Sequence, residues 1–176
     1  MAEPDALSPS PTLHLLCGKI ASGKSTLTER LGRQDRTVVI SEDAWLSALF
    51  GDEMTSVRDY VRCSNRLRSI VGPHVASLLN AGLSVVLDFP ANTVETRAWM
   101  RTILDQTDAA HALHVLDVPD DVCIARLHAR NAAGGNPFAA TEEQFHQISA
   151  HFVPPDLEEG FNIVRHGQQP DLTGSS

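Results

Sequence analysis

The sequence predicts an α/β fold of three layers, in which a parallel sheet of five strands lies between two layers of helices. Two observations predict this class. Short apolar runs alternate with stretches of helical spacing, and the runs are apolar throughout, as buried parallel strands require. A length of 176 residues suits one domain with a sizeable core. The expected strands are residues 13–17, 37–40, 84–87, 112–116 and 161–164.

The first expected strand leads into a phosphate-binding loop. Residues 18–25 read Gly-Lys-Ile-Ala-Ser-Gly-Lys-Ser, a complete G-x-x-x-x-G-K-S motif, and residues 26–31 have helical spacing. The glycines let backbone N–H groups and the positive end of the following helix point at bound phosphates. We therefore expect this loop to bind ATP. The predicted nucleotide-binding residues are Gly18, Ala21, Ser22, Gly23, Lys24, Ser25 and Thr26.

Two side chains of the loop have predicted chemical roles. Lys24 is the predicted catalytic cation, because it can reach the β- and γ-phosphates of ATP. The Ser25 hydroxyl is a predicted ligand of Mg²⁺, which prefers hard oxygen ligands. Lys19 is the only other lysine of the chain and is expected to be a solvated loop residue.

The second expected strand, residues 37–40, leads into Ser41-Glu42-Asp43 and a helical stretch. In an open parallel sheet, ligands bind beyond the carboxyl ends of the strands, so Asp43 is placed to face the cleft. It is the predicted catalytic base and a predicted substrate-binding residue, because a kinase needs a carboxylate that accepts the proton of the acceptor hydroxyl. The alternative is that Asp43 only caps the helix, with Ser41 as a rival cap.

Residues 57–79 have the apolar spacing of a helix, and Gly72-Pro73 is expected to mark a bend or a restart. The positions of this apolar stripe are Val57, Val61, Ser64, Leu67, Val71, Val75 and Leu78. Arg58, Arg62 and Arg66 lie beside this stripe at intervals of four residues. They form a cationic ridge that could bind a phosphate or carboxylate of the acceptor, and the alternative is a solvated face balanced in part by Asp59.

Asp88 follows the third apolar strand, residues 84–87. A carboxylate at this place holds Mg²⁺ or its water ligands behind the loop serine, so Asp88 is the second predicted metal ligand. The other interpretation, an aspartate that starts a turn, is the weaker one because the chain also contains the phosphate loop.

The segment after the fourth strand is predicted to form a lid. Arg126 and Arg130 lie one helical turn apart, just before a segment with two glycines at residues 131–137. Such a segment can close over the nucleotide and bring positive charge to the transferring phosphoryl group, so both arginines are predicted catalytic residues. Residues 141–145 are then typical of a capped helix start.

Bulk properties exclude several other classes of protein. The net charge of −8 argues against a long nucleic acid or an anionic membrane as partner. Three cysteines without close spacing indicate buried thiols, and the nearest histidine pairs, His111/His114 and His146/His151, do not suggest a metal site. No apolar run has the length of a membrane span, and the acidic start does not read as a signal peptide, so we expect a cytoplasmic protein. Residues 1–11 and 167–176 are expected to be flexible tails around one domain at residues 12–166.

The chain resembles the small P-loop kinases grouped around polynucleotide kinase and the zeta-toxin-like kinases, with gluconate kinase a more distant relative. The motifs that carry the resemblance are residues 18–25, Ser41-Glu42-Asp43, Asp88 with Asn92-Thr93 and Arg97, and residues 118–121 leading to Arg126 and Arg130. The resemblance implies a P-loop NTPase fold with a small lid, and it adds Asn92 to the predicted substrate-binding residues. Leu46 stands where the polynucleotide kinases usually have an arginine, which leaves the acceptor open.

Together these residues predict an ATP- and Mg²⁺-dependent kinase that transfers the γ-phosphoryl group to a hydroxyl of a small molecule or nucleotide. One alternative is a nucleotide-gated switch, in which ATP binding or hydrolysis rearranges residues 130–140 for a protein partner. Another is a phosphate-binding scaffold without catalysis. The acceptor, the preference for ATP over GTP and the oligomeric state stay open at this point.

Overall fold

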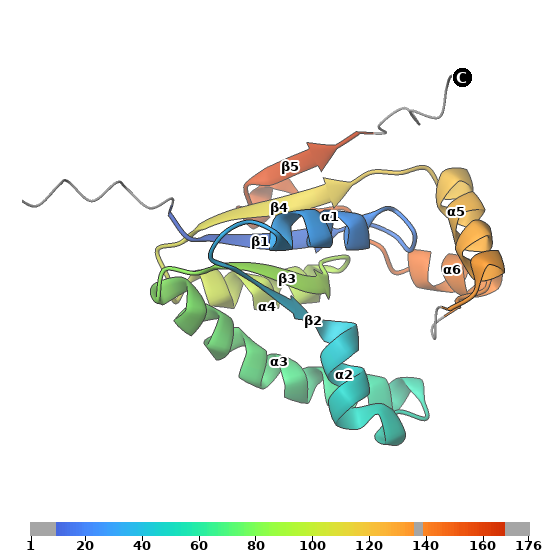
Figure 1. Ribbon diagram of the computed structural model, residues 1–176, viewed down its shortest axis with the longest axis horizontal. Helices are drawn as coiled ribbons and strands as arrows, with labels where there is room; N and C mark the ends of the chain where they lie inside the picture. Colours follow the sequence, from blue (N-terminus) through green and yellow to red (C-terminus); the bar gives the residue numbers. More distant parts are fainter. Residues whose placement is uncertain (1–9, 136–138, 168–176) are drawn as a thin grey trace, which may run out of the picture.

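A computed structural model describes residues 10–135 and 139–167 of the chain (Figure 1). Five strands form one sheet in the order β2-β3-β1-β4-β5, and every neighbouring pair is parallel. The predicted α/β fold with a five-stranded parallel sheet is therefore confirmed. Its elements are β1 (Thr12–Cys17), α1 (Lys24–Gly32), β2 (Thr37–Ser41), α2 (Glu42–Phe50), η1 (Gly51–Glu53), α3 (Val57–Asn80), β3 (Ser84–Pro90), α4 (Val94–Leu104), β4 (Ala110–Leu116), α5 (Asp120–Ala133), α6 (Glu142–Ser149), η2 (Leu157–Glu159) and β5 (Ile163–His166).

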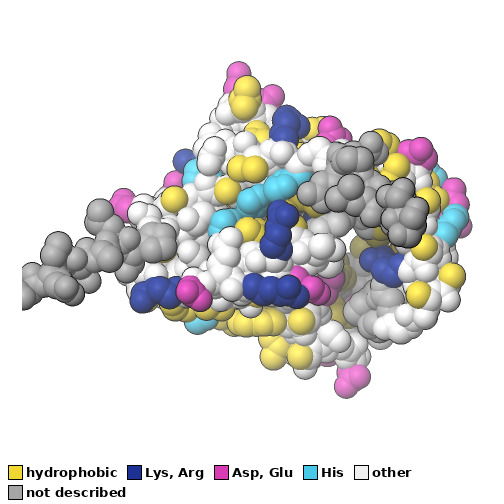
Figure 2. Space-filling view, turned by 45° about the horizontal axis from the view of Figure 1, so that its top comes forward, with side chains coloured by type: hydrophobic (Ala, Val, Ile, Leu, Met, Phe, Trp, Pro, Cys, Tyr) yellow, Lys and Arg dark blue, Asp and Glu magenta, His cyan; other side chains and the backbone are white. Residues whose placement is uncertain are grey.

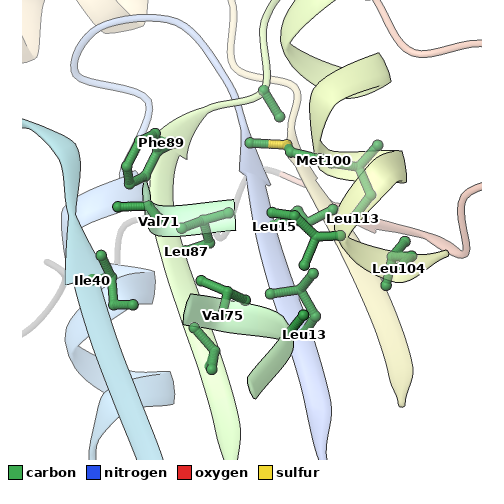
Figure 3. Close-up of a cluster of buried hydrophobic side chains, with 14 of the residues drawn as sticks. Leu13, Leu15, Ile40, Val71, Val75, Leu87, Phe89, Met100, Leu104 and Leu113 are labelled. Carbon is green, nitrogen blue, oxygen red and sulfur yellow. The ribbon is translucent and has the colours of Figure 1, made fainter. Parts of the chain in front are cut away.

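Both faces of the sheet are covered by helices, as its apolar strands require. On one face α3 and α4 pack over the centre of the sheet, where Leu13, Leu87 and Leu113 meet Val71 and Met100 (Figure 3). On the other face α1 covers a smaller cluster that consists of Leu16, Leu27, Leu31, Val86 and Leu116. This packing fixes the sheet against the start of α1, where the phosphate loop lies.

The fifth strand and helix α3 differ from their predicted form. The fifth strand begins at Ile163, two residues later than expected, because the buried Phe161 packs into the core before the strand begins. Helix α3 continues through Pro73 without a restart. Pro73 has no N–H to donate to the carbonyl of Ser69. Because Ser69 is exposed, water can donate to this carbonyl instead.

The N-terminal end of α3 extends past the core. Val57 is 81% exposed and Val61 is 50% exposed, so the apolar stripe is not buried at its first two positions. The buried stripe begins at Cys63 and Ser64 and continues to Leu79. Figure 1 shows α2, η1 and the start of α3 projecting together from one edge of the sheet.

A row of three histidines crosses β1, β4 and β5 on the face that α1 partly covers. His114 Nε2 lies 3.0 Å from His14 Nδ1, and its Nδ1 lies 2.9 Å from His166 Nε2. Figure 2 shows histidine side chains gathered in a band on this side of the molecule. The pKa of His114 is lowered to about 4, mainly by burial and in addition by the neighbouring His14, His166 and Arg30. Sequence spacing did not indicate this row.

Several predictions concern the ends of the chain and the lid. Residues 1–9 and 168–176, which make up most of the two predicted tails, lie outside the described residues, as do residues 136–138 of the predicted lid. The predicted helix start near residue 141 is confirmed, because Thr141 and Gln144 form a capping box. Cys17, Cys63 and Cys123 are free and buried, as expected. In the described part of the chain, no helix is both long and apolar enough to span a membrane.

Candidate active site

The phosphate loop connects β1 to α1 as predicted. Its backbone turns through left-handed conformations at Ala21, with φ 60°, and at Gly23, with φ 105°, before helix α1 begins at Lys24. The first N–H groups of a helix lack intrahelical partners, and α1 carries no acidic side chain in its first turn. The loop therefore presents uncompensated positive charge, which suits phosphate groups.

Lys24 lies across this loop. Its ammonium group donates to the carbonyl of Gly18 at 2.5 Å and to the carbonyl of Lys19 at 2.7 Å. Burial lowers the pKa of Lys24 to about 8, although the carboxylate of Asp88 acts in the opposite direction. A negatively charged ligand in the loop would favour the charged ammonium form.

Lys19 has a different environment from the one expected of a solvated residue. Its ammonium group lies 2.6 Å from the carboxylate of Asp120, the first residue of α5, and over the ring of Phe152. Lys19 therefore connects the phosphate loop to the helix that carries Arg126 and Arg130.

The side chain of Asp43 does not cap its helix, because another residue does. The hydroxyl of Ser41 accepts the backbone N–H of Ala44, which makes Ser41 the N-cap of α2. The side chain of Asp43 is exposed in the first turn of that helix. The alternative interpretation of Asp43 as a cap is therefore wrong.

The neighbouring Glu42 is the buried anchor of α2, and sequence patterns did not indicate it. Its side chain is 1% exposed and accepts hydrogen bonds from Ser64 at 2.7 Å and Tyr60 at 3.4 Å. Arg68 lies 3.5 Å away and also stacks over Trp99. Because these hydrogen-bonding and ionic partners all come from α3, Glu42 fixes the start of α2 against α3 and thus the position of Asp43.

Asp88 lies in β3 directly beside Ser41 of β2. Burial raises the pKa of its carboxyl, the charges of Asp43 and Glu42 raise it further, and Lys24 lowers it. A divalent cation would relieve this repulsion, and the hydroxyl of Ser25 at the start of α1 offers a second hard ligand. Ser25 and Asp88 thus fit a Mg²⁺ ion that would be held by few protein ligands and completed by phosphate oxygens. Among residues 10–135 and 139–167 no set of three or more His, Cys, Asp or Glu is arranged to hold a metal alone.

Asn92 contacts the phosphate loop instead of facing an open cleft. Its Oδ1 accepts the N–H of Gly18, and its Nδ2 donates to the carbonyl of Gly18, each at 2.9 Å. Both ends of the amide are therefore engaged with the loop, which does not support the predicted role of Asn92 in binding the acceptor.

The predicted arginine residues all lie on exposed helix surfaces. Arg58, Arg62 and Arg66 are exposed on α3, and Arg62 lies 3.3 Å from Asp59. Arg126 and Arg130 are exposed on α5, one turn apart as predicted. The roles of these five arginines stay predictions, because their contacts in the structure do not distinguish a binding surface from a solvated one.

Comparison with known proteins identifies the family. The family model AAA_33, described as an AAA domain, matches residues 13–155, a range that contains the phosphate loop, Asp43 and Asp88. The chain belongs to this family. No curated protein matches it.

Solved structures of low sequence identity share the fold. A candidate kinase from Chloroflexus aurantiacus j-10-fl is 21% identical, with a TM-score of 0.69 over 89% of this chain and 85% of that one. A gluconokinase from Sinorhizobium meliloti 1021 is 17% identical, with a TM-score of 0.57 over 92% and 85% of the two chains. A chain of the Pnkp1/Rnl/Hen1 RNA repair complex is 22% identical, with a TM-score of 0.60 over 99% of this chain but 55% of that one. The AAA_33 protein described here thus has the fold of a small P-loop kinase.

Proposed function

We propose that this AAA_33 protein is an ATP- and Mg²⁺-dependent kinase that transfers the γ-phosphoryl group to a hydroxyl of a small molecule or nucleotide. The observation that carries the proposal is the position of Asp43. Its carboxylate is exposed, does not cap the helix, and lies close enough to Asp88 and Lys24 to influence their charges. These properties suit a catalytic base better than a structural residue.

Each residue of the site has a role in this proposal. Lys24 and the N–H groups at the start of α1 bind the phosphates and stabilise the charge of the transition state. Ser25 and Asp88 would hold Mg²⁺, which would neutralise charge on the phosphate oxygens. Asp43 accepts the proton of the acceptor hydroxyl and orients its oxygen toward the γ-phosphorus. Arg126 or Arg130 supplies further positive charge from α5.

The charge of the protein favours a small acceptor. A net charge of −8 disfavours a long nucleic acid, whereas a nucleoside, a sugar or another small alcohol is compatible with the exposed site around Asp43. The fold of the gluconokinase and of the Mycobacterium tuberculosis APS kinase, whose structure contains AMPPNP and APS, is consistent with nucleotide use. Three buried free thiols suit a reducing compartment, so we place the protein in the cytoplasm.

The test is phosphoryl transfer from γ-labelled ATP with Mg²⁺ to a panel of nucleosides, sugars, aminoglycosides and 5′-hydroxyl oligonucleotides, with the products identified by mass. Asp43→Asn should keep ATP binding and lower transfer by about 10² or more, because the base is lost. Asp52→Asn is the matched control, since Asp52 is an exposed aspartate in the nearby η1 turn, and it should leave transfer unchanged. Release of ADP without any labelled acceptor, and with no effect of Asp43→Asn, would favour a nucleotide switch and contradict the proposal.

A further inference from the structure

The contact between Asn92 and Gly18 joins two segments that are 74 residues apart in the sequence. A side-chain amide both donates and accepts, so Asn92 bonds the Gly18 peptide in the way that a neighbouring strand would. Gly18 is buried, which makes the loss of either bond costly because water cannot replace it. The first peptide of the phosphate loop is therefore held from outside the loop.

The same peptide also contacts the phosphate lysine. The carbonyl of Gly18 accepts from Asn92 Nδ2 at 2.9 Å and from Lys24 Nζ at 2.5 Å. Asn92 thus shares an acceptor atom with Lys24. A shift of the Asn92 amide would move the carbonyl against which the ammonium group of Lys24 is positioned.

Asn92 is itself held on both sides. The N–H of its neighbour Ala91 donates to the carbonyl of Leu16 at 2.8 Å, and its own carbonyl accepts the N–H of Val153 at 2.9 Å. These bonds connect the end of β3 to the end of β1 and to the segment that follows α6. These bonds fix the backbone of Asn92 and thus the point from which its side chain reaches Gly18.

Arg97 of α4 completes this support. Its side chain is fully buried and donates to the carbonyls of Ala91 at 3.0 Å and Val153 at 2.8 Å. It also forms a bidentate pair with Glu159, at 2.7 Å and 3.0 Å, which lowers the pKa of that carboxyl. Arg97 thus fixes the two segments between which the backbone of Asn92 lies.

We propose that Asn92 is a positioning residue for nucleotide binding: it fixes the Gly18 peptide and thereby the phosphate loop and Lys24, with Arg97 as its support. This inference rests on the proposed function, since it assigns to Asn92 a role toward ATP and removes it from the acceptor side. A purely structural Asn92 would affect folding, whereas a positioning residue affects phosphate binding in a chain that is still folded.

The test compares Asn92→Asp with Asn80→Asp. Asn80 is an exposed asparagine whose amide donates to the carbonyl of Gln106. Asn92→Asp keeps an acceptor for the Gly18 N–H but places a second carboxylate oxygen against the Gly18 carbonyl. We expect the Kd for MgATP to rise about tenfold or more, because the buried Gly18 carbonyl loses one of its two donors and faces a carboxylate oxygen instead. Asn80→Asp should bind MgATP like the wild type, and circular dichroism should show that both variants are folded.

The pH dependence of binding separates positioning from a general structural effect. A carboxylate at residue 92 would lie next to the ammonium group of Lys24 and would raise the pKa of Lys24. The pH at which MgATP affinity begins to fall should therefore be higher in Asn92→Asp than in the wild type. A loosened fold would lower affinity without moving that pH.

A measurement on the wild type covers the case in which Asn92→Asp does not fold. The Gly18 amide should be protected from hydrogen exchange before nucleotide is added, and rapid exchange at Gly18 would overturn the inference. A folded Asn92→Asp variant with the wild-type Kd would also overturn it. If the wild-type chain binds no MgATP at all, the proposed function fails, and this inference fails with it.

Discussion

The lowered pKa of Lys24 predicts that ATP affinity depends on pH. With a pKa of about 8, about nine-tenths of the Lys24 side chains carry a proton at pH 7 and about one-tenth at pH 9. ATP phosphates favour the charged form, so the pKa is higher in the complex than in the free protein, and binding takes up a proton above pH 8. Affinity therefore falls as the pH rises, and the Kd for MgATP should increase roughly tenfold between pH 7 and pH 9.

Isothermal titration calorimetry at constant ionic strength measures this effect directly. Repeating the titration in buffers of different ionisation enthalpy counts the protons taken up on binding. Two variants serve as controls. Lys24→Arg keeps its charge over this range, so its Kd should not change with pH even if binding is weaker. Lys19→Arg changes the other lysine of the loop and should keep the pH dependence of the wild type.

The reasoning would be refuted by a wild-type Kd that stays the same within twofold from pH 7 to pH 9. It would also be refuted if Lys24→Arg showed the same tenfold change, because another group would then be responsible. Binding without proton uptake at pH 9 would lead to the same conclusion.

Two further predictions concern the loop and the histidine row. Gly18→Ala would place a Cβ atom 2.5 Å from the hydroxyl of Ser22, so urea unfolding should show that the free energy of unfolding falls by about 1–3 kcal/mol. The control is Gly51→Ala, where a Cβ meets no described atom within 4 Å and the free energy of unfolding should change little. The pKa of His114 is lowered from 6.5 to about 4, so the unfolded chain binds more protons between these values and stability falls as the pH drops through this window. His114 should therefore contribute about 2 kcal/mol to the stability lost between pH 7 and pH 5, and this part should disappear in His114→Gln but persist in a variant of the exposed His74. An equal pH response in both histidine variants would contradict the assignment to His114.

The sequence indicated the fold and the phosphate loop because both depend on residues that are close together in the chain. Residues 18–25 form a contiguous motif, and apolar runs report burial on both faces directly. Asp43 and Asp88 could also be predicted as candidate site residues, because each lies near the carboxyl end of a strand, where ligands bind in an open parallel sheet.

The rest of the site depends on the strand order and on contacts between distant segments. Asn92 reaches Gly18 only because β3 lies next to β1, and the buried Glu42 finds its partners only because α3 packs beside α2. The histidine row likewise requires β4 to lie between β1 and β5 in register. A lone histidine or asparagine in one sequence carries no sign of such pairing.

The exposed start of α3 was missed for a related reason. Its spacing is helical from Val57 onward, but spacing alone does not say where a helix leaves the core. The first two turns extend past the edge of the sheet. The apolar side chain at Val71 is therefore buried, whereas the one at Val57, in the same pattern, is exposed.

The two lysines of this chain make the phosphate loop chemically distinguishable from the rest of the protein. An acylating reagent reacts with neutral amines, and the depressed pKa gives Lys24 a large neutral fraction at mildly alkaline pH, while Lys19 is paired with Asp120. Covalent labelling of side-chain amines, counted by mass spectrometry, would therefore report on this loop alone. Protection by a bound ligand would then measure occupancy of the loop without any knowledge of the acceptor.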